Sequence, residues 1–269
     1  MSKRLTLISL LASLLVASRA DAQFRAPVPS PEDFHTELGL MFFTPTPELT
    51  LTTGDARVGT VDFVQEFGIG EDTFREFRAV VKAARKHKIR YARVSFEYDQ
   101  DAVLQRPVTF QNVTFPVTAN GNADIKWEVH RFGYEWDFVR RTYGFVGLIT
   151  ELKYNKVKAT VSASGVVNGQ TQSLAASVDQ TAPAPTIGGI GRGYLGKYFS
   201  VTGEFTGLKI DRDDFLAKFY DFDVYAAGHL GKNAGVQLGY RSITVDFLVD
   251  NDQGSMKMKG RYLGGFVRF

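Results

Sequence analysis

Histidine is the side chain best suited to acid–base chemistry near neutral pH, and the chain has four of them: His35, His87, His130 and His229. None has the His-Glu-x-x-His spacing that places two imidazoles on one helix face around zinc. His130 follows Glu128 by two residues, and a surface histidine–carboxylate pair of this kind is able to act as a general base. The chain has no cysteine, which excludes a thiolate metal site and a cysteine nucleophile.

The remaining polar motifs are incomplete as functional sites. The acidic run 211–214 has oxygen ligands for a divalent cation but lacks the full calcium-loop pattern, so it fits a solvated loop better. The glycines of 188–191 have no following Lys-Ser/Thr, which excludes a phosphate-binding loop, and Asn112-Val113-Thr114 is an incidental match to a glycosylation acceptor. Four further acids fit solvated strand tips: Asp99, Asp101, Asp246 and Asp250. We therefore predict no catalytic residue, no metal site and no cofactor.

Composition bounds the class of protein. The 269 residues are 44% hydrophobic and 13% aromatic, and 32 Lys+Arg against 29 Asp+Glu give a net charge of +3. No long basic block is present, so a nucleic-acid partner is not expected. The abundance of glycine (26) and phenylalanine (22) favours sheet over helix.

The first 22 residues have the pattern of a secretory signal peptide. Lys3 and Arg4 supply the positive start, Leu5 to Ala17 are apolar, and Ala20-Asp21-Ala22 supplies small residues for cleavage. We predict cleavage near Ala22, an extended periplasmic leader over 23–33 and a single domain over 34–269. No later stretch reaches 18 apolar residues, so the rest of the chain does not cross a membrane as helices.

Side chains alternate with a period of two along nearly all of 34–269, which predicts strands. Ten runs are separated alternately by short and long connections, the long ones being 44–73, 100–123 and 163–183. This rhythm is typical of a closed antiparallel transmembrane β-barrel with short periplasmic turns and long extracellular loops. Ten strands are expected, with eight or twelve as alternatives; 47–54 and 58–68 would pair as the extra hairpin of a twelve-stranded barrel. A soluble sandwich with a large aromatic core is the alternative fold.

The two faces of the runs differ in polarity. One face has the aromatic band Phe132, Tyr134, Trp136 and Phe138, which fits contact with lipid. The opposite face is then the lumen, and its charges are expected to pair in a narrow interior because unpaired buried charges are costly. The predicted lumen charge network is Arg131, Glu135, Asp137, Glu151, Lys153, Arg192, Glu204, Asp221, Asp223, Arg241 and Arg268.

The last strand carries a specific resemblance. Residues 261–269 end on Phe269, with Leu263 and Val267 on the same face. In this the chain resembles the outer-membrane β-barrel proteins of Gram-negative bacteria, whose last strand typically ends in Phe and is recognised by the barrel-insertion machinery. The resemblance implies a location in the bacterial outer membrane. It also implies the insertion machinery, outer-membrane lipid and lipopolysaccharide as partners.

Three functions remain open from the sequence. The first is a non-enzymatic barrel with an occluded, salt-bridged lumen and a structural or surface-binding role, whose surface ligand is unknown. The second is a narrow channel for ions or small solutes. The third is a hydrolase at the outer rim, as in omptin-type proteases, although no local motif here matches their residues.

Overall fold

The structure is a computed structural model that describes residues 33–52, 60–110, 113–117, 119–167, 170–212, 215–249 and 252–269. The predicted signal peptide (1–22) and all of the predicted leader (23–33) except Asp33 lie outside these ranges. So do Asn112, Asp213, Asp214 and Asp250. No helix within the described ranges combines the length and apolarity needed to cross a bilayer.

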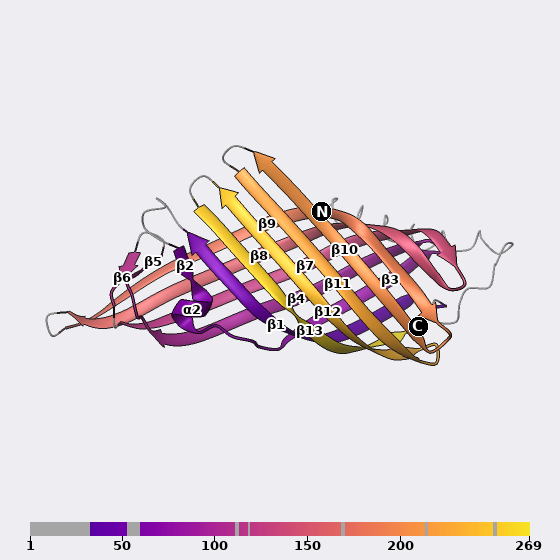
Figure 1. The fold of residues 1–269 in the computed structure, drawn as a ribbon, viewed down its shortest axis with the longest axis horizontal. Helices are drawn as coiled ribbons and strands as arrows, with labels where there is room; N and C mark the ends of the chain where they lie inside the picture. Colours follow the sequence, from indigo (N-terminus) through magenta and orange to yellow (C-terminus); the bar gives the residue numbers. More distant parts are fainter. Residues whose placement is uncertain are drawn as a thin grey trace, which may run out of the picture.

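Ten antiparallel strands form one closed barrel (Figure 1), which confirms the predicted fold. Around the wall the order is β13-β12-β11-β10-β9-β8-β7-β4-β3-β1, and β13 pairs with β1 to close it. The strands of the wall are β1 (Thr36–Thr52), β3 (Phe74–Ala84), β4 (His87–Val103), β7 (Asn120–Arg141), β8 (Gly144–Val167), β9 (Gln170–Leu195), β10 (Phe199–Arg212), β11 (Phe215–Leu230), β12 (Ala234–Val249) and β13 (Asp252–Arg268). The elements outside the wall are β2 (Thr60–Asp62), α2 (Phe63–Phe67), β5 (Val108–Phe110) and β6 (Val113–Phe115).

The alternatives of eight and twelve strands are wrong. β2 pairs with the tip of β1 over only three positions, from Thr50↔Asp62 to Thr52↔Thr60. The wall passes directly from β1 to β3, so this hairpin extends above the barrel and adds no strand to it.

The two ends of the barrel are different. At one end lie the four short turns, centred on residues 85–86, 142–143, 196–198 and 231–233, together with the chain terminus. The seam is closed there by the backbone N–H of His35, which donates to the carbonyl of Phe269 over 2.7 Å. Gly196 and Gly231 adopt φ of 70°, the left-handed conformation that their tight turns require. Short turns and a shared terminal end are typical of the periplasmic side of an outer-membrane barrel.

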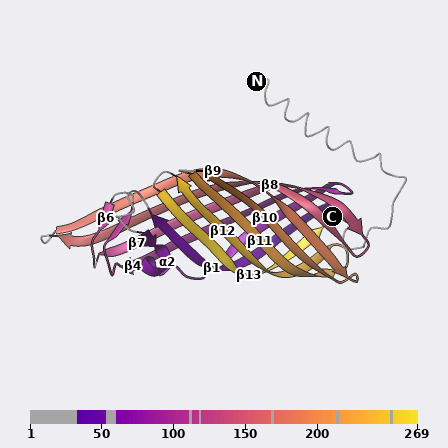
Figure 2. The same cartoon turned by 45° about the horizontal axis from the view of Figure 1, so that its top comes forward.

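At the opposite end the strands continue far past the barrel body, and the β8–β9 hairpin projects furthest (Figures 1 and 2). Much of the predicted long loops is therefore strand: β1 runs to Thr52, β4 to Val103, and β8 and β9 pair from Gly144↔Gly193 to Val167↔Gln170. The physical reason is that alternation continues beyond the lipid-facing region with small residues, and each strand supplies its neighbour's backbone hydrogen bonds.

Two prolines mark where β9 becomes an edge strand. β9 pairs with β10 only from Leu195 to Ile187, whereas its pairing with β8 continues to Gln170. Pro183 and Pro185 lie just beyond that limit. Proline cannot donate a backbone hydrogen bond, so it is tolerated here, where one side of the strand has no ladder to support.

β7 changes the polarity of its two faces part-way along. Toward the periplasmic end of β7, outward Phe132 and Trp136 are exposed while inward Arg131 and Glu135 are buried. Toward the extracellular end the arrangement is reversed: inward Trp127 is buried, while the outward side chains include Glu128 and Lys126. The reversal fits a strand that leaves lipid for water at this height, because the outer face must then change from apolar to polar.

Candidate functional site

The predicted aromatic band lies on the outside of the barrel. Phe132 is 54% exposed, and Tyr134, Trp136 and Phe138 are similarly accessible. The predicted assembly residues Leu263, Val267 and Phe269 are also on the outer face and exposed. The soluble sandwich is wrong as an alternative, because its core would have enclosed these side chains between two sheets.

All eleven predicted lumen charges point into the barrel, on its periplasmic half. Ten are buried and Arg192 is half-buried. Most of them gather in three groups that share the interior with additional charges.

The central group is built around two acids. Asp221 accepts hydrogen bonds from Arg131 (3.1 Å), Lys153 (2.8 Å) and Arg241 (2.8 and 2.9 Å). Glu76 accepts from Arg131 (3.1 Å) and also contacts Arg241. These side chains come from β3, β7, β8, β11 and β12, so the group ties opposite walls together.

The second group lies between β4, β7 and β10. The ammonium of Lys88 is 2.6 Å from Glu135 and 3.0 Å from Asp137, and it sits 3.8 Å from the centre of the Phe145 ring. The Arg90 guanidinium is 2.6 Å from Glu204 and 3.6 Å from Glu135. Burying these charges is tolerable because each has an opposite charge within contact distance.

The third group is at the periplasmic mouth. Arg268 is 2.5 Å from Glu37, and its guanidinium also approaches His229, whose other ring nitrogen is 3.0 Å from the Ser200 hydroxyl. Arg192, higher in the wall, donates to the Thr202 and Tyr225 hydroxyls, both over 2.8 Å.

The sequence reasoning missed five interior charges, which are Glu37, Glu76, Arg78, Lys88 and Arg90. With them the interior groups contain eight acids and eight bases. The acids are Glu37, Glu76, Glu135, Asp137, Glu151, Glu204, Asp221 and Asp223; the bases are Arg78, Lys88, Arg90, Arg131, Lys153, Arg192, Arg241 and Arg268. The alternation Glu76-x-Arg78 was a usable signal, and the balanced charge explains how so many ions stay buried together.

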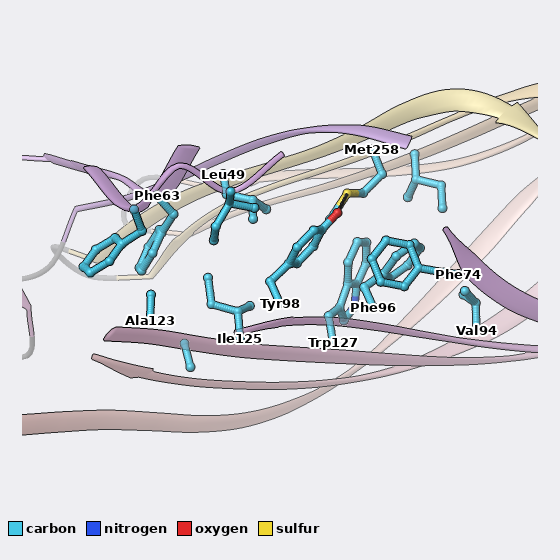
Figure 3. Packing of buried hydrophobic residues seen from close by; sticks show 14 of the residues in the cluster. Leu49, Phe63, Phe74, Val94, Phe96, Tyr98, Ala123, Ile125, Trp127 and Met258 are labelled. Atoms are coloured by element: carbon cyan, nitrogen blue, oxygen red, sulfur yellow. Dashed lines mark hydrogen bonds between the residues drawn. The ribbon is translucent and has the colours of Figure 1, made fainter. Parts of the chain in front are cut away.

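The extracellular half of the interior is apolar, which was not predicted. Phe74, Phe96 and Trp127 pack with ring centroids 5.0–5.1 Å apart, and the Tyr98 hydroxyl reaches across the lumen to the sulfur of Met258 at 3.8 Å (Figure 3). Above them α2 closes the mouth with buried Phe63 and Phe67, among other apolar residues.

Two polar contacts fix the segment that contains α2, a helix cap from Asp62 and an ion pair of Glu66. The Asp62 carboxylate caps the helix by accepting from the backbone N–H groups of Val64 and Gln65, at 3.0 and 3.1 Å. The guanidinium of Arg106, from the connection between β4 and β5, is 2.5 Å from Glu66. Packed side chains and an ion pair therefore hold α2 in place at the extracellular end.

Little space remains inside. The cavity among the lumen charges, lined by Arg78, Arg90, Arg131 and Glu135 among others, has a volume of about 40 Å³. This is room for about three water molecules.

The proposed general base is not in a cleft. His130 faces outward at the upper edge of the aromatic band, where its Nδ1 is 3.0 Å from the Tyr91 hydroxyl. Glu128 is paired with Arg93 at 3.2 Å. Both side chains lie on the outer face of β7, and each has a partner on β4.

The other candidate acids are separated as well. Asp99 and Asp101 share the side-chain amide of Asn122 as donor (2.7 and 3.0 Å), and Asp246 is paired with Lys218 at 2.9 Å. Asp211 is paired with Lys209 at 3.0 Å. Within the described part of the chain, no three His, Asp or Glu side chains come together as metal ligands.

Comparison with solved structures matches the fold. The outer membrane protease OmpT from Escherichia coli superposes with a TM-score of 0.60 at 11% sequence identity, over 91% of this chain and 99% of that protein. The chain has the fold of an outer-membrane β-barrel protein. At this identity the likeness shows the fold alone.

Further outer-membrane proteins match more distantly. They include Ail of Yersinia pestis (TM-score 0.36, 10% identity, 87% of this chain and 99% of that one) and the Pseudomonas putida toluene transporter TodX (0.38, 7%, 89% and 91%). These superpositions are too loose to support an argument about this barrel. The sequence matches no protein-family model and no curated protein.

Proposed function

We propose that this outer-membrane barrel is non-conducting and non-catalytic, and that it serves to hold its extracellular sheet at the cell surface as a binding element. The observation that carries the proposal is the filled interior. The periplasmic half is occupied by paired ions and the extracellular half by aromatic and aliphatic side chains, and the cavity among the ions has a volume of about 40 Å³.

The projecting sheet is the part of the molecule that has surplus length. A transmembrane strand needs about 9–11 residues, whereas β7, β8 and β9 contain 22, 24 and 26. Residues 156–167 of β8 extend past the lipid-facing part by roughly 40 Å along the strand. This length adds nothing to crossing the membrane and supports a role outside it.

The projecting sheet also contains a hollow suited to a ligand. It has a volume of about 720 Å³, and half of its lining residues are polar while the other half, such as Val103 and Leu174, are apolar. The polar ones are Asp101, Asn120, Asn122, Ser162, Ser164 and Ser173. Amide and hydroxyl groups hydrogen-bond without strong charge selection, so the hollow suits a neutral polar ligand such as a carbohydrate.

Planar-bilayer recording of the purified full chain tests the closed interior. We expect no stable unit currents. Stable currents that change in Arg131→Gln or Arg241→Gln would show that the charged interior conducts, and the narrow-channel function would replace this proposal.

A shortened hairpin tests the surface role. Thr160 and Ser177 are cross-strand partners, so replacing residues 161–176 by Asn-Gly keeps the register and gives a two-residue turn. We expect the shortened barrel to keep heat-modifiable gel migration and to lose binding to soluble glycans on an array. Equal binding by both forms, or no binding by the full chain, counts against the surface role.

A further inference from the structure

The periplasmic turns carry positive charge only. The turns and their flanking residues contain Arg85, Lys86, Arg140, Arg141, Lys197 and Lys232, and no acid occurs among 84–87, 139–144, 195–198 or 230–233. Lys232 lies 3.8 Å from the exposed carboxylate of Asp33. The other bases therefore have no surface acid in their own turns.

Four of these bases are brought together, because β4 pairs with β7 and their turns are neighbours. Arg140 donates to the backbone carbonyl of Arg85, and the Lys86 ammonium donates to the carbonyl of Phe138 over 3.4 Å. These contacts hold the two turns against each other. Arg85, Lys86, Arg140 and Arg141 are called the basic cluster below.

The described contacts of Lys86, Arg140 and Arg141 in the basic cluster do not neutralise these three charges. Lys86 and Arg140 donate to backbone carbonyls, and within the described ranges Lys86, Arg140 and Arg141 form no ion pair with an acid. The closest acid in sequence, Asp137, points into the barrel and is held by Lys88 at 3.0 Å. Like charges gathered in this way create a positive potential that attracts an anion.

The surroundings place this potential at the membrane surface. Trp136, Phe138 and Val139 are exposed on the lipid-facing side beside the cluster, and Tyr143 in the β7–β8 turn is 71% exposed. Tryptophan and tyrosine gather at the headgroup level of a bilayer. The basic cluster is therefore at the height of lipid phosphate groups, on the side where the short turns lie.

We propose that the basic cluster binds the phosphate of an anionic phospholipid in the inner leaflet of the outer membrane. The exposed Arg141 guanidinium offers paired N–H donors that match phosphate oxygens, and the neighbouring Arg140 and Lys86 add positive charge. The adjacent aromatic and aliphatic side chains pack against the acyl chains of the same lipid.

Native mass spectrometry of the full folded barrel, with phosphatidylglycerol or phosphatidylcholine of identical acyl chains, tests the assignment. We expect selective retention of phosphatidylglycerol. At about 1 kcal/mol per base near a membrane surface, Arg140→Gln/Arg141→Gln is expected to weaken retention by about 20- to 30-fold. Arg141→Gln alone disturbs no hydrogen bond between the turns and is expected to weaken it by about fivefold.

The matched control is Lys156→Gln/Lys158→Gln, which removes two exposed bases from the outer face of β8 on the extracellular side. It is expected to leave selectivity unchanged. Equal retention of both lipids by the unaltered barrel would overturn the proposal, and so would an equal loss in the control.

Two further arms distinguish other anions. Displacement of phosphatidylglycerol by equimolar inorganic phosphate would assign the cluster to free phosphate and overturn a lipid site. Loss of co-sedimentation with peptidoglycan in Arg140→Gln/Arg141→Gln, with lipid selectivity intact, would assign it to the cell wall instead.

Discussion

Asp221→Asn is the sharpest test of the interior, because it removes one negative charge and hardly changes shape. Asp221 has a 4% exposed side chain and contacts Arg131, Lys153 and Arg241. The substitution leaves the eight interior bases facing seven acids. Removing one partner from a buried ion pair typically costs about 3–5 kcal/mol.

The lower end of that range is expected here, about 3 kcal/mol, because each cation keeps another acid. Arg131 and Arg241 still contact Glu76, and Lys153 still lies 3.3 Å from Glu151. The assay is the urea midpoint for unfolding the barrel from lipid vesicles. Asp246→Asn is the matched control, since its carboxylate is 22% exposed and its pair with Lys218 should be worth at most about 1 kcal/mol.

A second substitution separates charge balance from a general loss of packing. Adding Lys153→Met to Asp221→Asn removes one acid and one base together, so part of the lost stability is expected to return. If Asp221→Asn shifts the midpoint no more than Asp246→Asn does, the idea that ion pairing determines the stability of the periplasmic half is refuted.

Three further predictions concern the wall, the extracellular surface and the seam. Gly188→Ala should abolish folding, because the added Cβ would lie 1.8 Å from the Phe205 carbonyl oxygen. Gly191→Ala is the control and should fold normally, because its added Cβ would have no atom within 4 Å. Heat-modifiable gel migration measures the folding of both variants. Hydrogen bonds from Lys257 and Lys259 lower the pKa of Glu48 below its ordinary 4.5. The ionised carboxylate therefore adds to the free energy of unfolding above pH 4.5, and this stabilisation is lost as pH falls through the lowered pKa. Glu48→Gln should therefore lower stability by about 0.5 kcal/mol at pH 7 and by progressively less as pH falls below 4.5, measured as urea midpoints. Deleting Phe269 removes its backbone bonds to His35 and Thr36 at the seam, and should reduce membrane yield while secretion is unchanged; normal yield would contradict this.

The sequence was sufficient to predict the strands of the barrel wall, because a strand in a bilayer must place apolar side chains on its lipid-facing side. Phe132, Tyr134, Trp136 and Phe138 alternate with Arg131, Glu135 and Asp137, as expected of a strand with lipid on one side and a polar interior on the other. The count of ten strands followed from the alternation of short and long connections. Tight turns and continuous alternation are local properties, so a single sequence contains them.

The sequence was insufficient where one strand crosses from lipid to water. On β3 the apolar residues Phe74 and Phe77 are three apart, so they point to opposite faces; Phe74 is buried inside and Phe77 is 40% exposed outside. The strand crosses the membrane boundary between Phe74 and Phe77. The inner face is apolar on the extracellular side of this boundary and charged on the other side. The sequence analysis assigned one polarity to each face along the whole strand, so it did not predict Glu76 and Arg78 as lumen residues.

The interior has a charged periplasmic half and an apolar extracellular half, and this division has the same physical cause. Within the bilayer, lipid tails are as apolar as leucine, so placing apolar side chains inside the barrel gains little over facing them to lipid. Paired ions with definite partners can occupy that space and fix which walls meet, as Asp221 does with β7, β8 and β12. Above the bilayer, water surrounds the wall, and burying Trp127, Phe96 and Tyr98 inside removes apolar surface from it. The apolar layer therefore belongs to the part of the barrel that stands in water, and the ion layer belongs to the part enclosed by lipid.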